Sequence, residues 1–126
     1  MITVRIPTDK NFNFKECKKL FNNYKKFIND KNKFRNIVDN TFFYSFFYNE
    51  KHIGCTYFYM RDNKLFVNGF ANRHLHTLVI DCLKQSLEWF NCNIYAETEQ
   101  KTAKLCLLRA GFKKISNNLY EYERTV

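Results

Sequence analysis

Proline and glycine are scarce in this sequence, with Pro 1 and Gly 3 in 126 residues. This scarcity excludes a collagen-like or low-complexity chain, and it predicts helices and strands joined by short turns. The length predicts a single domain, 1–126, that is large enough to bury a true hydrophobic core. Hydrophobic residues make up 45% of the chain, which argues against intrinsic disorder.

Several motifs of known chemistry are missing as well. The chain contains no G-x-G-x-x-G, no P-loop and no G-x-S-x-G, so nothing in it indicates a dinucleotide-binding, kinase or hydrolase fold. No run approaches the roughly 20 apolar residues of a membrane span, and the first residues lack the apolar centre of a signal peptide. We therefore expect a cytoplasmic protein that makes no contact with a membrane.

The cysteines are odd in number and form no C-x-x-C pair. They are Cys17, Cys55, Cys82, Cys92 and Cys106. Their mostly apolar surroundings predict free thiols in a reducing compartment and no structural disulfide. We take none of them to have zinc-ligand spacing with His52, His74 or His76, so we expect no metal site. His52 lies in a predicted turn and is expected on the surface.

Positive charge is in excess, with a formal net charge of +9 and a pI near 9.4. Such a field attracts the phosphates of nucleic acid, of an anionic membrane or of a nucleotide cofactor. Many lysines crowd residues 15–33, where an amphipathic helix would carry them as a solvated face. Phe 14 and Tyr 8 are high counts for so short a chain, and they favour a bulky aromatic core over a ligand groove lined with rings.

Hydrophobic periodicity predicts alternating helices and strands along the chain. The pattern gives a strand over 2–6, a helix over 14–28, a short helix around 34–38, and three strands over 41–48, 53–60 and 64–70. Asp62-Asn63 is typical of a tight hairpin turn. A helix over 77–90, a strand over 94–98, a helix over 101–110 and a hairpin over 112–122 follow. Thr77 is the expected N-cap of the first of these helices, and Gly111 ends the second.

The segment from Asn93 to Phe112 carries the most specific pattern, because it reads as strand, helix, glycine stop and strand. It resembles the closing segment of the GNAT acyltransferase superfamily, whose loose pattern is N-x-x-A-x-x-L-Y-x-x-x-G-F. Aligned on Gly111-Phe112, Ala103 falls on the family alanine. The family asparagine, leucine and tyrosine are replaced by Gln100, Cys106 and Leu107. The order of elements also matches GNAT topology, which implies an α+β fold whose mostly antiparallel sheet has about six or seven strands and three or four flanking helices.

The resemblance implies an acyl-CoA-dependent N-acyltransferase that uses acetyl-CoA or a related acyl-CoA, needs no metal and acts on a primary amine. In that family the pyrophosphate sits on N–H groups at the start of the central helix, within a glycine-rich loop. The matching residues here, 72–78, contain no glycine. The loop instead offers Arg73, His74, His76 and Thr77. Either these side chains contact the phosphates, or the loop is a solvated segment that no longer binds CoA well.

The resemblance further places the acyl carbonyl against backbone N–H groups of the strand over 65–70, at Phe66, Val67 and Asn68. Gln100 and Ala103, on the last helix, belong to the same cofactor site.

Glu97 and Glu99, at the end of the preceding strand, are the candidate catalytic carboxylates, as base or as ligands of a cationic acceptor. Their alternation along a strand predicts that they point the same way. The competing interpretation is that both are exposed and begin the next helix. The family tyrosine that protonates the leaving thiolate is Leu107 here. The sequence does not assign that role among Tyr57, Tyr59, Tyr95 and Cys106.

Two alternatives remain open at this point. One is a catalytically degenerate GNAT-like module that binds nucleic acid or an acidic partner protein through its basic surface. Bases would then stack on the rings of Phe42, Tyr44, Phe46 and Tyr48. The other is an unrelated α+β domain. For an enzyme, the positive charge favours an amine carried on an acidic macromolecule over a polyamine. We expect a monomer, or a homodimer formed through the strand at 119–122.

Overall fold

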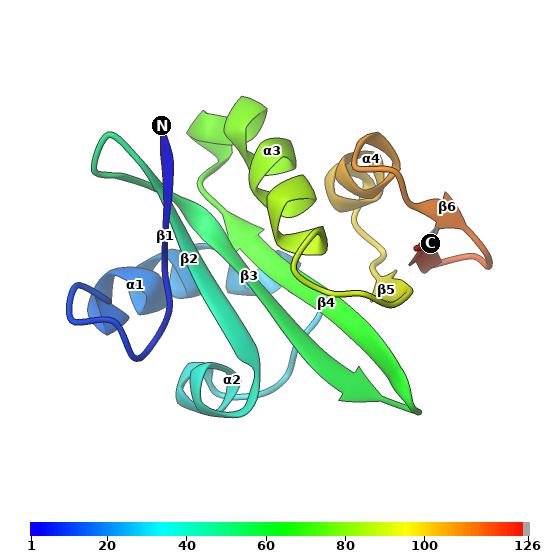
Figure 1. The fold of residues 1–126 in the computed structure, drawn as a ribbon, viewed down its shortest axis with the longest axis horizontal. Coiled ribbons are helices and arrows are strands. Elements are labelled where there is room, and N and C mark those ends of the chain that lie inside the picture. Colours follow the sequence, from blue (N-terminus) through cyan, green and yellow to red (C-terminus); the bar gives the residue numbers. More distant parts are fainter. Residues whose placement is uncertain (125–126) are drawn as a thin grey trace.

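The computed structural model describes residues 1–124 and, within them, every side chain except that of His76. These residues form a seven-stranded sheet with four α-helices packed against it (Figure 1). The strand order is β1-β2-β3-β4-β5-β7-β6. Neighbouring strands are antiparallel except for β4 and β5, which are parallel. The α+β class and the mixed, mostly antiparallel sheet predicted from the sequence are confirmed.

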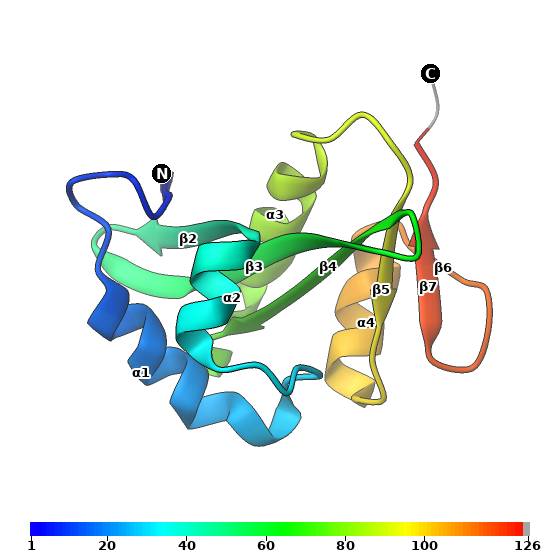
Figure 2. The same cartoon turned by 90° about the horizontal axis from the view of Figure 1, so that it is seen from below.

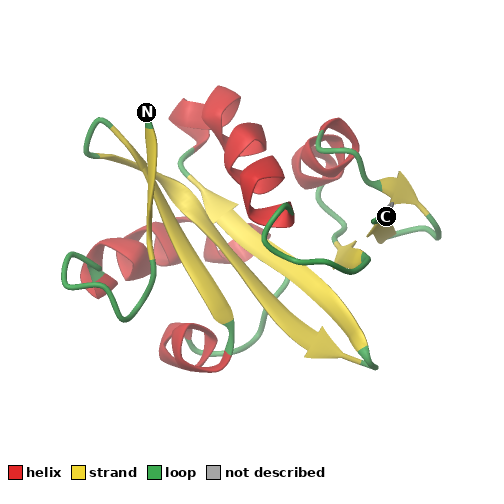
Figure 3. Ribbon diagram, in the orientation of Figure 1, coloured by secondary structure: helices red, strands yellow, loops and turns green. Residues whose placement is uncertain are grey.

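The first half of the chain forms the wide antiparallel part of the sheet. Its elements are β1 (Ile2–Arg5), α1 (Phe14–Tyr24), the 3-10 turn η1 (Lys25–Phe27), α2 (Phe34–Asn40), β2 (Phe42–Tyr48), β3 (Lys51–Arg61) and β4 (Lys64–Ala71). The turns at Asn49-Glu50 and Asp62-Asn63 have positive φ at both residues, as type I′ hairpin turns require. Figure 3 shows how tight these connections are, in line with the low proline and glycine content.

The surface position predicted for His52 is wrong. The first of the two hairpin turns takes up only two residues, so β3 already begins at Lys51 and His52 belongs to the strand. The His52 side chain is 9% exposed, and its ring stacks on Phe47 at a centroid distance of 4.7 Å.

The second half of the chain builds the other end of the sheet. Its elements are the 3-10 turn η2 (Arg73–Leu75), α3 (His76–Leu87), β5 (Ile94–Glu97), α4 (Lys101–Arg109), β6 (Lys113–Lys114) and β7 (Leu119–Tyr122). The predicted N-cap role of Thr77 is wrong, because η2 runs directly into α3 and Leu75 takes the cap position.

The end of α4 follows the sequence prediction closely. Gly111 has a φ of 107°, a left-handed value that glycine adopts without strain. The Phe112 N–H donates to the Leu107 carbonyl at 3.0 Å, and the Gly111 N–H donates to the Leu108 carbonyl at 3.2 Å. Together these bonds form a Schellman motif, which satisfies the last carbonyl groups of the helix.

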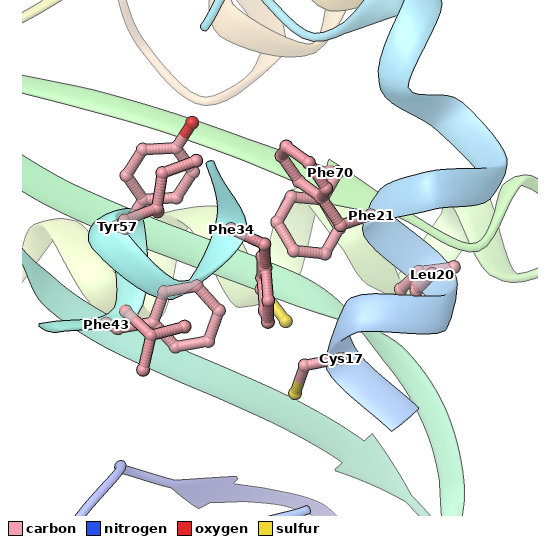
Figure 4. Close-up of a cluster of buried hydrophobic side chains, with 10 residues drawn as sticks. Cys17, Leu20, Phe21, Phe34, Phe43, Tyr57 and Phe70 are labelled. Atoms are coloured by element: carbon pink, nitrogen blue, oxygen red, sulfur yellow. The ribbon is translucent and has the colours of Figure 1, made fainter. Parts of the chain in front are cut away.

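Helices cover both faces of the sheet, with α1 and α2 on one face and α3 and α4 on the other (Figures 1 and 2). The α1 face has the aromatic core that the composition predicts (Figure 4). There the Phe34 ring lies 5.1 Å from Phe21 and 5.7 Å from Phe43, measured between centroids. Among the described residues, no helix is long and apolar enough to cross a membrane.

Candidate functional site

The two parallel strands of the sheet separate soon after they meet. β4 and β5 pair only at Leu65–Ile94 and Phe66–Tyr95. Figure 2 shows β5 turning away from β4 beyond that point. From Val67 onward, the edge of β4 that faces β5 therefore has no strand partner among the described residues. A sheet opened in this way exposes backbone hydrogen-bonding groups that a ligand can use.

A cavity of about 240 Å³ lies in this separation. Its wall includes Val67, Asn68 and Gly69 of β4, Ala96 at the end of β5, Val79 and Cys82 of α3, and Ala103, Cys106 and Leu107 of α4. Most of these side chains are apolar and few polar groups face the space. A lining of that kind suits the apolar stretch of a ligand whose polar ends reach outside the cavity.

Two glycines let β3 and β4 approach each other beside this cavity. A Cβ atom on Gly54 would lie 2.6 Å from the Phe70 carbonyl oxygen, and one on Gly69 would lie 2.6 Å from the Cys55 carbonyl oxygen. Both separations are too short for a carbon atom. The paired strands can lie so close together only because these two positions lack side chains.

A second, more polar cavity of about 400 Å³ lies at the end of β5. Its lining includes Lys26, Glu97, Glu99, Gln100 and Asn118. The segment 27–29, Glu97, Thr98 and Gln100 line both cavities. A group bound in the polar cavity can therefore meet a ligand in the apolar one.

Asn29 bridges the two separated strands. Its side-chain Nδ2 donates to the Glu97 carbonyl at 3.1 Å, and its own carbonyl accepts from Asn68 Nδ2 at 2.9 Å. One residue of the loop after α1 thus holds the end of β5 at a fixed position relative to β4. No local pattern in the sequence marks Asn29, because the chain positions that it joins are 39 and 68 residues away.

The loop that carries Asn29 is itself anchored to the sheet. The Tyr57 hydroxyl donates to Asp30 Oδ2 at 2.8 Å, and Asp30 Oδ1 accepts from the Asn32 N–H at 2.8 Å. Burial, and then the adjacent Asp30 carboxylate, raise the pKa of Tyr57 far above its ordinary value. Tyr57 therefore stays a neutral hydrogen-bond donor and holds the loop in place.

Arg73 lies at the cavity beside the start of α3. Its guanidinium carbon is 4.4 Å from the centroid of the Phe27 ring and 5.3 Å from that of Tyr24. Leu75 holds the N-cap position of α3 and its side chain makes no cap hydrogen bond. Arg73 lines the apolar cavity just before α3 begins, and a cation beside a helix N-terminus is a suitable place for an anion.

The residues predicted to bind the cofactor fall into three groups. Val67, Asn68, Arg73, Gln100 and Ala103 line the apolar cavity. Phe66 is buried against Tyr59 and Tyr95, while His74 and Thr77 are exposed, and none of these three lines either cavity. His76 begins α3, but its side chain lies outside what the structure describes.

The two predicted catalytic carboxylates occupy different positions. Glu97 lines both cavities and its Oε1 lies 3.3 Å from Arg61 Nη1, whereas Glu99 lines only the polar cavity. Glu97 is the last residue of β5, and Glu99 lies beyond the strand next to Gln100, the N-cap position of α4. Of the four residues considered as thiolate donors, Cys106 lines the apolar cavity, while Tyr57 and Tyr95 bond to Asp30 and Glu121.

No family model and no curated protein matches this sequence. Solved structures nevertheless share its fold. The aminoglycoside acetyltransferase AAC(6')-Ib in complex with coenzyme A is 14% identical, with a TM-score of 0.76 over 98% of this chain and 95% of that one. A Bacillus subtilis acetyltransferase in complex with CoA is 10% identical, with a TM-score of 0.68 over 99% and 100%. An Elizabethkingia anophelis GNAT family acetyltransferase with acetyl-CoA bound is 17% identical, with a TM-score of 0.62 over 97% of both chains. The chain therefore has the GNAT fold.

Proposed function

We propose that this protein is an acyl-CoA-dependent N-acyltransferase that transfers an acyl group, in the first instance acetyl, to a primary amine. The separation of β4 from β5 around an apolar cavity is the observation that carries the proposal. The similar structures described above hold coenzyme A or acetyl-CoA, which supports the same class of co-substrate here.

The co-substrate would lie with its pantetheine arm in the apolar cavity and its phosphates at the start of α3. The guanidinium of Arg73 supplies charge there in place of the close backbone approach that glycines would allow. The acyl oxygen would accept from the open edge of β4. The Gly69 N–H now donates to Asn68 Oδ1 at 2.8 Å, an oxygen that an acyl carbonyl can replace. Donors held ready in this way stabilise charge that develops on the oxygen.

Glu97 is the proposed base. The acceptor enters the polar cavity as an ammonium ion and loses one proton to the Glu97 carboxylate, directly or through a water. The neutral amine then attacks the thioester carbon, a C–N bond forms, and the C–S bond breaks. The nitrogen still carries a surplus proton at that stage, and this proton passes to the departing thiolate. Because the acceptor itself supplies it, the reaction does not require the tyrosine that Leu107 replaces.

Local charge favours an ammonium group even though the whole protein is basic. Glu97 and Glu99 both line the polar cavity, where Lys26 is the opposing charge in the lining and Arg61 pairs with Glu97 from outside it. Salt limits the reach of exposed charges to about 8 Å at physiological ionic strength, so these carboxylates dominate at contact distance. The net charge of +9 is spread over the larger surface that a macromolecule would touch, and it favours amines carried on nucleic acid or on an acidic protein. An acceptor panel of small polyamines, acidic peptides and aminoacylated RNA separates these classes, and turnover on the polyamines alone would contradict the preference for acidic carriers.

A binding module without catalysis is the second candidate, and the apolar Leu107 at the family tyrosine position favours it. The row of aromatic residues on β2 lends it less support. Phe46 is fully buried, and the Trp89 ring covers Tyr44 and Phe46 at centroid distances of 4.5 and 6.0 Å. Phe42 is 58% exposed, so one ring of the four is mainly open to solvent.

Calorimetry with acetyl-CoA tests the proposal. We expect micromolar binding that Arg73→Ala weakens about tenfold, the scale of one charge-assisted contact. Arg35→Ala is the matched control, because Arg35 also stacks on an aromatic ring, at 4.0 Å from Phe14, but lines neither cavity. It should bind acetyl-CoA like the unaltered protein. Absence of binding at millimolar CoA would refute the acyltransferase proposal, and salt-dependent RNA or DNA binding would then support the binding module.

A further inference from the structure

A second cluster of reactive side chains lies between α1 and the sheet, and of its four residues only Cys55 also lines the apolar cavity. It consists of Cys17 from α1, Ser45 from β2, and His52 and Cys55 from β3. Cys17, Ser45 and Cys55 are 0%, 1% and 3% exposed. Figure 4 shows the Cys17 sulfur directed from α1 toward the sheet. Polar atoms so deeply buried need partners, and here they are each other's partners.

The distances within the cluster are short. His52 Nε2 lies 2.9 Å from Ser45 Oγ and 3.5 Å from Cys55 Sγ. Ser45 Oγ also accepts from Cys17 Sγ at 3.3 Å and from Cys55 Sγ at 3.8 Å. The ligand atoms of Cys17, His52 and Cys55 all lie within 4.8 Å of one another.

These separations fit a tetrahedral zinc centre. Zn–S bonds of about 2.3 Å and Zn–N bonds of about 2.0–2.1 Å put a sulfur and a nitrogen ligand about 3.5 Å apart. That value equals the distance between Cys55 Sγ and His52 Nε2. We propose that Cys17, His52 and Cys55 bind a zinc ion, with the Ser45 hydroxyl nearest to the fourth position. Two thiol protons leave to solvent on binding, and two thiolates neutralise the charge of the ion.

The surroundings of His52 hold it as a ligand requires. Its Nδ1 lies 3.7 Å from Glu16 Oε1, on the side of the ring opposite the cluster. At that distance the carboxylate attracts a proton on Nδ1, which favours the tautomer that leaves Nε2 to face a metal. The Phe47 ring stacks on the imidazole and restricts its rotation.

A β-bulge explains why the spacing was not recognised in the sequence. His52 and Cys55 are three residues apart, and in a regular strand such residues face opposite sides of the sheet. The register of β2 and β3 shifts between Phe46 and Phe47, which pair with Gly54 and His52. Ile53 is the extra residue, and it returns His52 to the face of Cys55. The expectation that no cysteine has zinc-ligand spacing with His52 therefore fails for this pair.

A metal here would join α1 to the β2–β3 hairpin. α1 continues through η1 into the segment 27–29, which lines both cavities and carries the Asn29 bridge. The ion would thus act as a structural cross-link that holds the wall of the acyl-CoA site. It takes no part in the transfer itself, so this inference stands or falls independently of the proposed activity.

The test is metal loading of the full chain under reducing conditions. Protein stripped with a chelator is reloaded with Zn²⁺, passed over a desalting column and assayed for zinc by elemental analysis. Co²⁺ loading gives a second readout, because thiolate-bound cobalt shows a charge-transfer absorption. We expect one zinc per chain, a thiolate–cobalt band and a higher Tm in the loaded protein. His52→Ala and Cys55→Ser should lose the stoichiometric zinc.

Two further variants keep the test decisive if those two fail to fold. Cys82→Ser removes a thiol that is 3% exposed and lies outside the cluster, and it should keep its zinc. Glu16→Gln changes a side chain that is 40% exposed, and it should weaken zinc binding by about 10- to 100-fold with the fold intact. The proposal is overturned if the unaltered protein shows no thiolate–cobalt band, if Glu16→Gln binds zinc unchanged, or if a folded His52→Ala keeps its zinc.

Discussion

β4 pairs with β3 at every position from Lys64 to Ala71, but with β5 only at Leu65 and Phe66. The junction of β3 with β4 is continuous and ends in a tight type I′ turn, and glycines bring its strands together, so we call it the closed junction. The junction of β4 with β5, the open junction, loses its pairing after two residues and encloses the cavity. The same strand thus provides rigidity on one edge and unpaired backbone groups on the other. This fold therefore places its candidate binding site where the sheet is left incomplete.

The largest expected effect comes from disturbing the closed junction. In Gly54→Ala the new Cβ would lie 2.6 Å from the Phe70 carbonyl oxygen and 2.9 Å from the Ala71 Cα. Because these contacts are with backbone, the strands must move apart, and we expect the free energy of unfolding to fall by about 3 kcal/mol. Urea titration measures it. Gly111→Ala is the control, since its Cβ meets only the Tyr122 ring, at 3.4 Å, and its cost of about 1–2 kcal/mol is backbone strain. A smaller loss for Gly54→Ala than for Gly111→Ala would show that the close approach of the strands is not critical.

The open junction is tested by Glu97→Gln. Gln keeps the shape and the neighbours of the side chain but cannot accept the ammonium proton. We expect kcat to fall about 100-fold while acetyl-CoA affinity stays unchanged. Glu99→Gln is the matched control, because Glu99 lines only the polar cavity, and its effect should be confined to the KM of the acceptor. Steady-state kinetics on the best acceptor of the panel decides, and a larger kcat loss in Glu99→Gln would transfer the base role to that residue.

The regular parts of this molecule follow from local patterns. Alternating and three- to four-residue spacings place the strands and helices, Asp62-Asn63 marks the β3–β4 turn, and Gly111 ends α4. Each of these signals lies within a few residues of the structure that it predicts. Thr77 is an instructive failure, because a 3-10 turn, which the composition of the loop does not reveal, takes up the residues before α3.

The site depends instead on contacts between distant parts of the chain. The family pattern selected Val67, Asn68, Arg73, Gln100 and Ala103, which line the apolar cavity in the structure, and their contact with a cofactor stays a prediction. The separation of β4 from β5 leaves no trace in the periodicity of either strand. The meeting of Cys17 with His52 and Cys55 depends on how α1 packs and on a bulge, and neither is a local property.

The bridge across the open junction gives the next smaller effect. Asn29→Ala removes the bond from Nδ2 to the Glu97 carbonyl at 3.1 Å, one hydrogen bond worth about 1 kcal/mol. The end of β5 then gains freedom, and we expect the KM of the acceptor to rise about fivefold with a smaller change in acetyl-CoA affinity. Asn32→Ala is the control from the same loop, since Asn32 contacts Asp30 through its main-chain N–H, which the substitution keeps. Equal effects in the two variants would show that the change comes from the loop as a whole and not from the hydrogen bond between Asn29 and Glu97.

The smallest effect is expected where the closed junction supports the open one. Tyr57 belongs to β3, but its hydroxyl holds Asp30 of the loop that carries Asn29, at 2.8 Å. Tyr57→Phe keeps the buried ring and removes only that bond, so the free energy of unfolding should fall by about 1 kcal/mol and the acceptor KM should rise about twofold.

The raised pKa of Tyr57 adds a pH dependence. Above about pH 10 an unfolded tyrosine loses its proton while the folded one keeps it, so the unaltered protein should lose stability as the pH rises there. Tyr57→Phe should lack that part of the alkaline loss, and urea titrations at pH 8 and pH 11 compare the two proteins. An equal alkaline loss in both would mean that the pKa of Tyr57 is not raised in solution, and equal stability at pH 8 would mean that the Tyr57–Asp30 bond does not hold the loop.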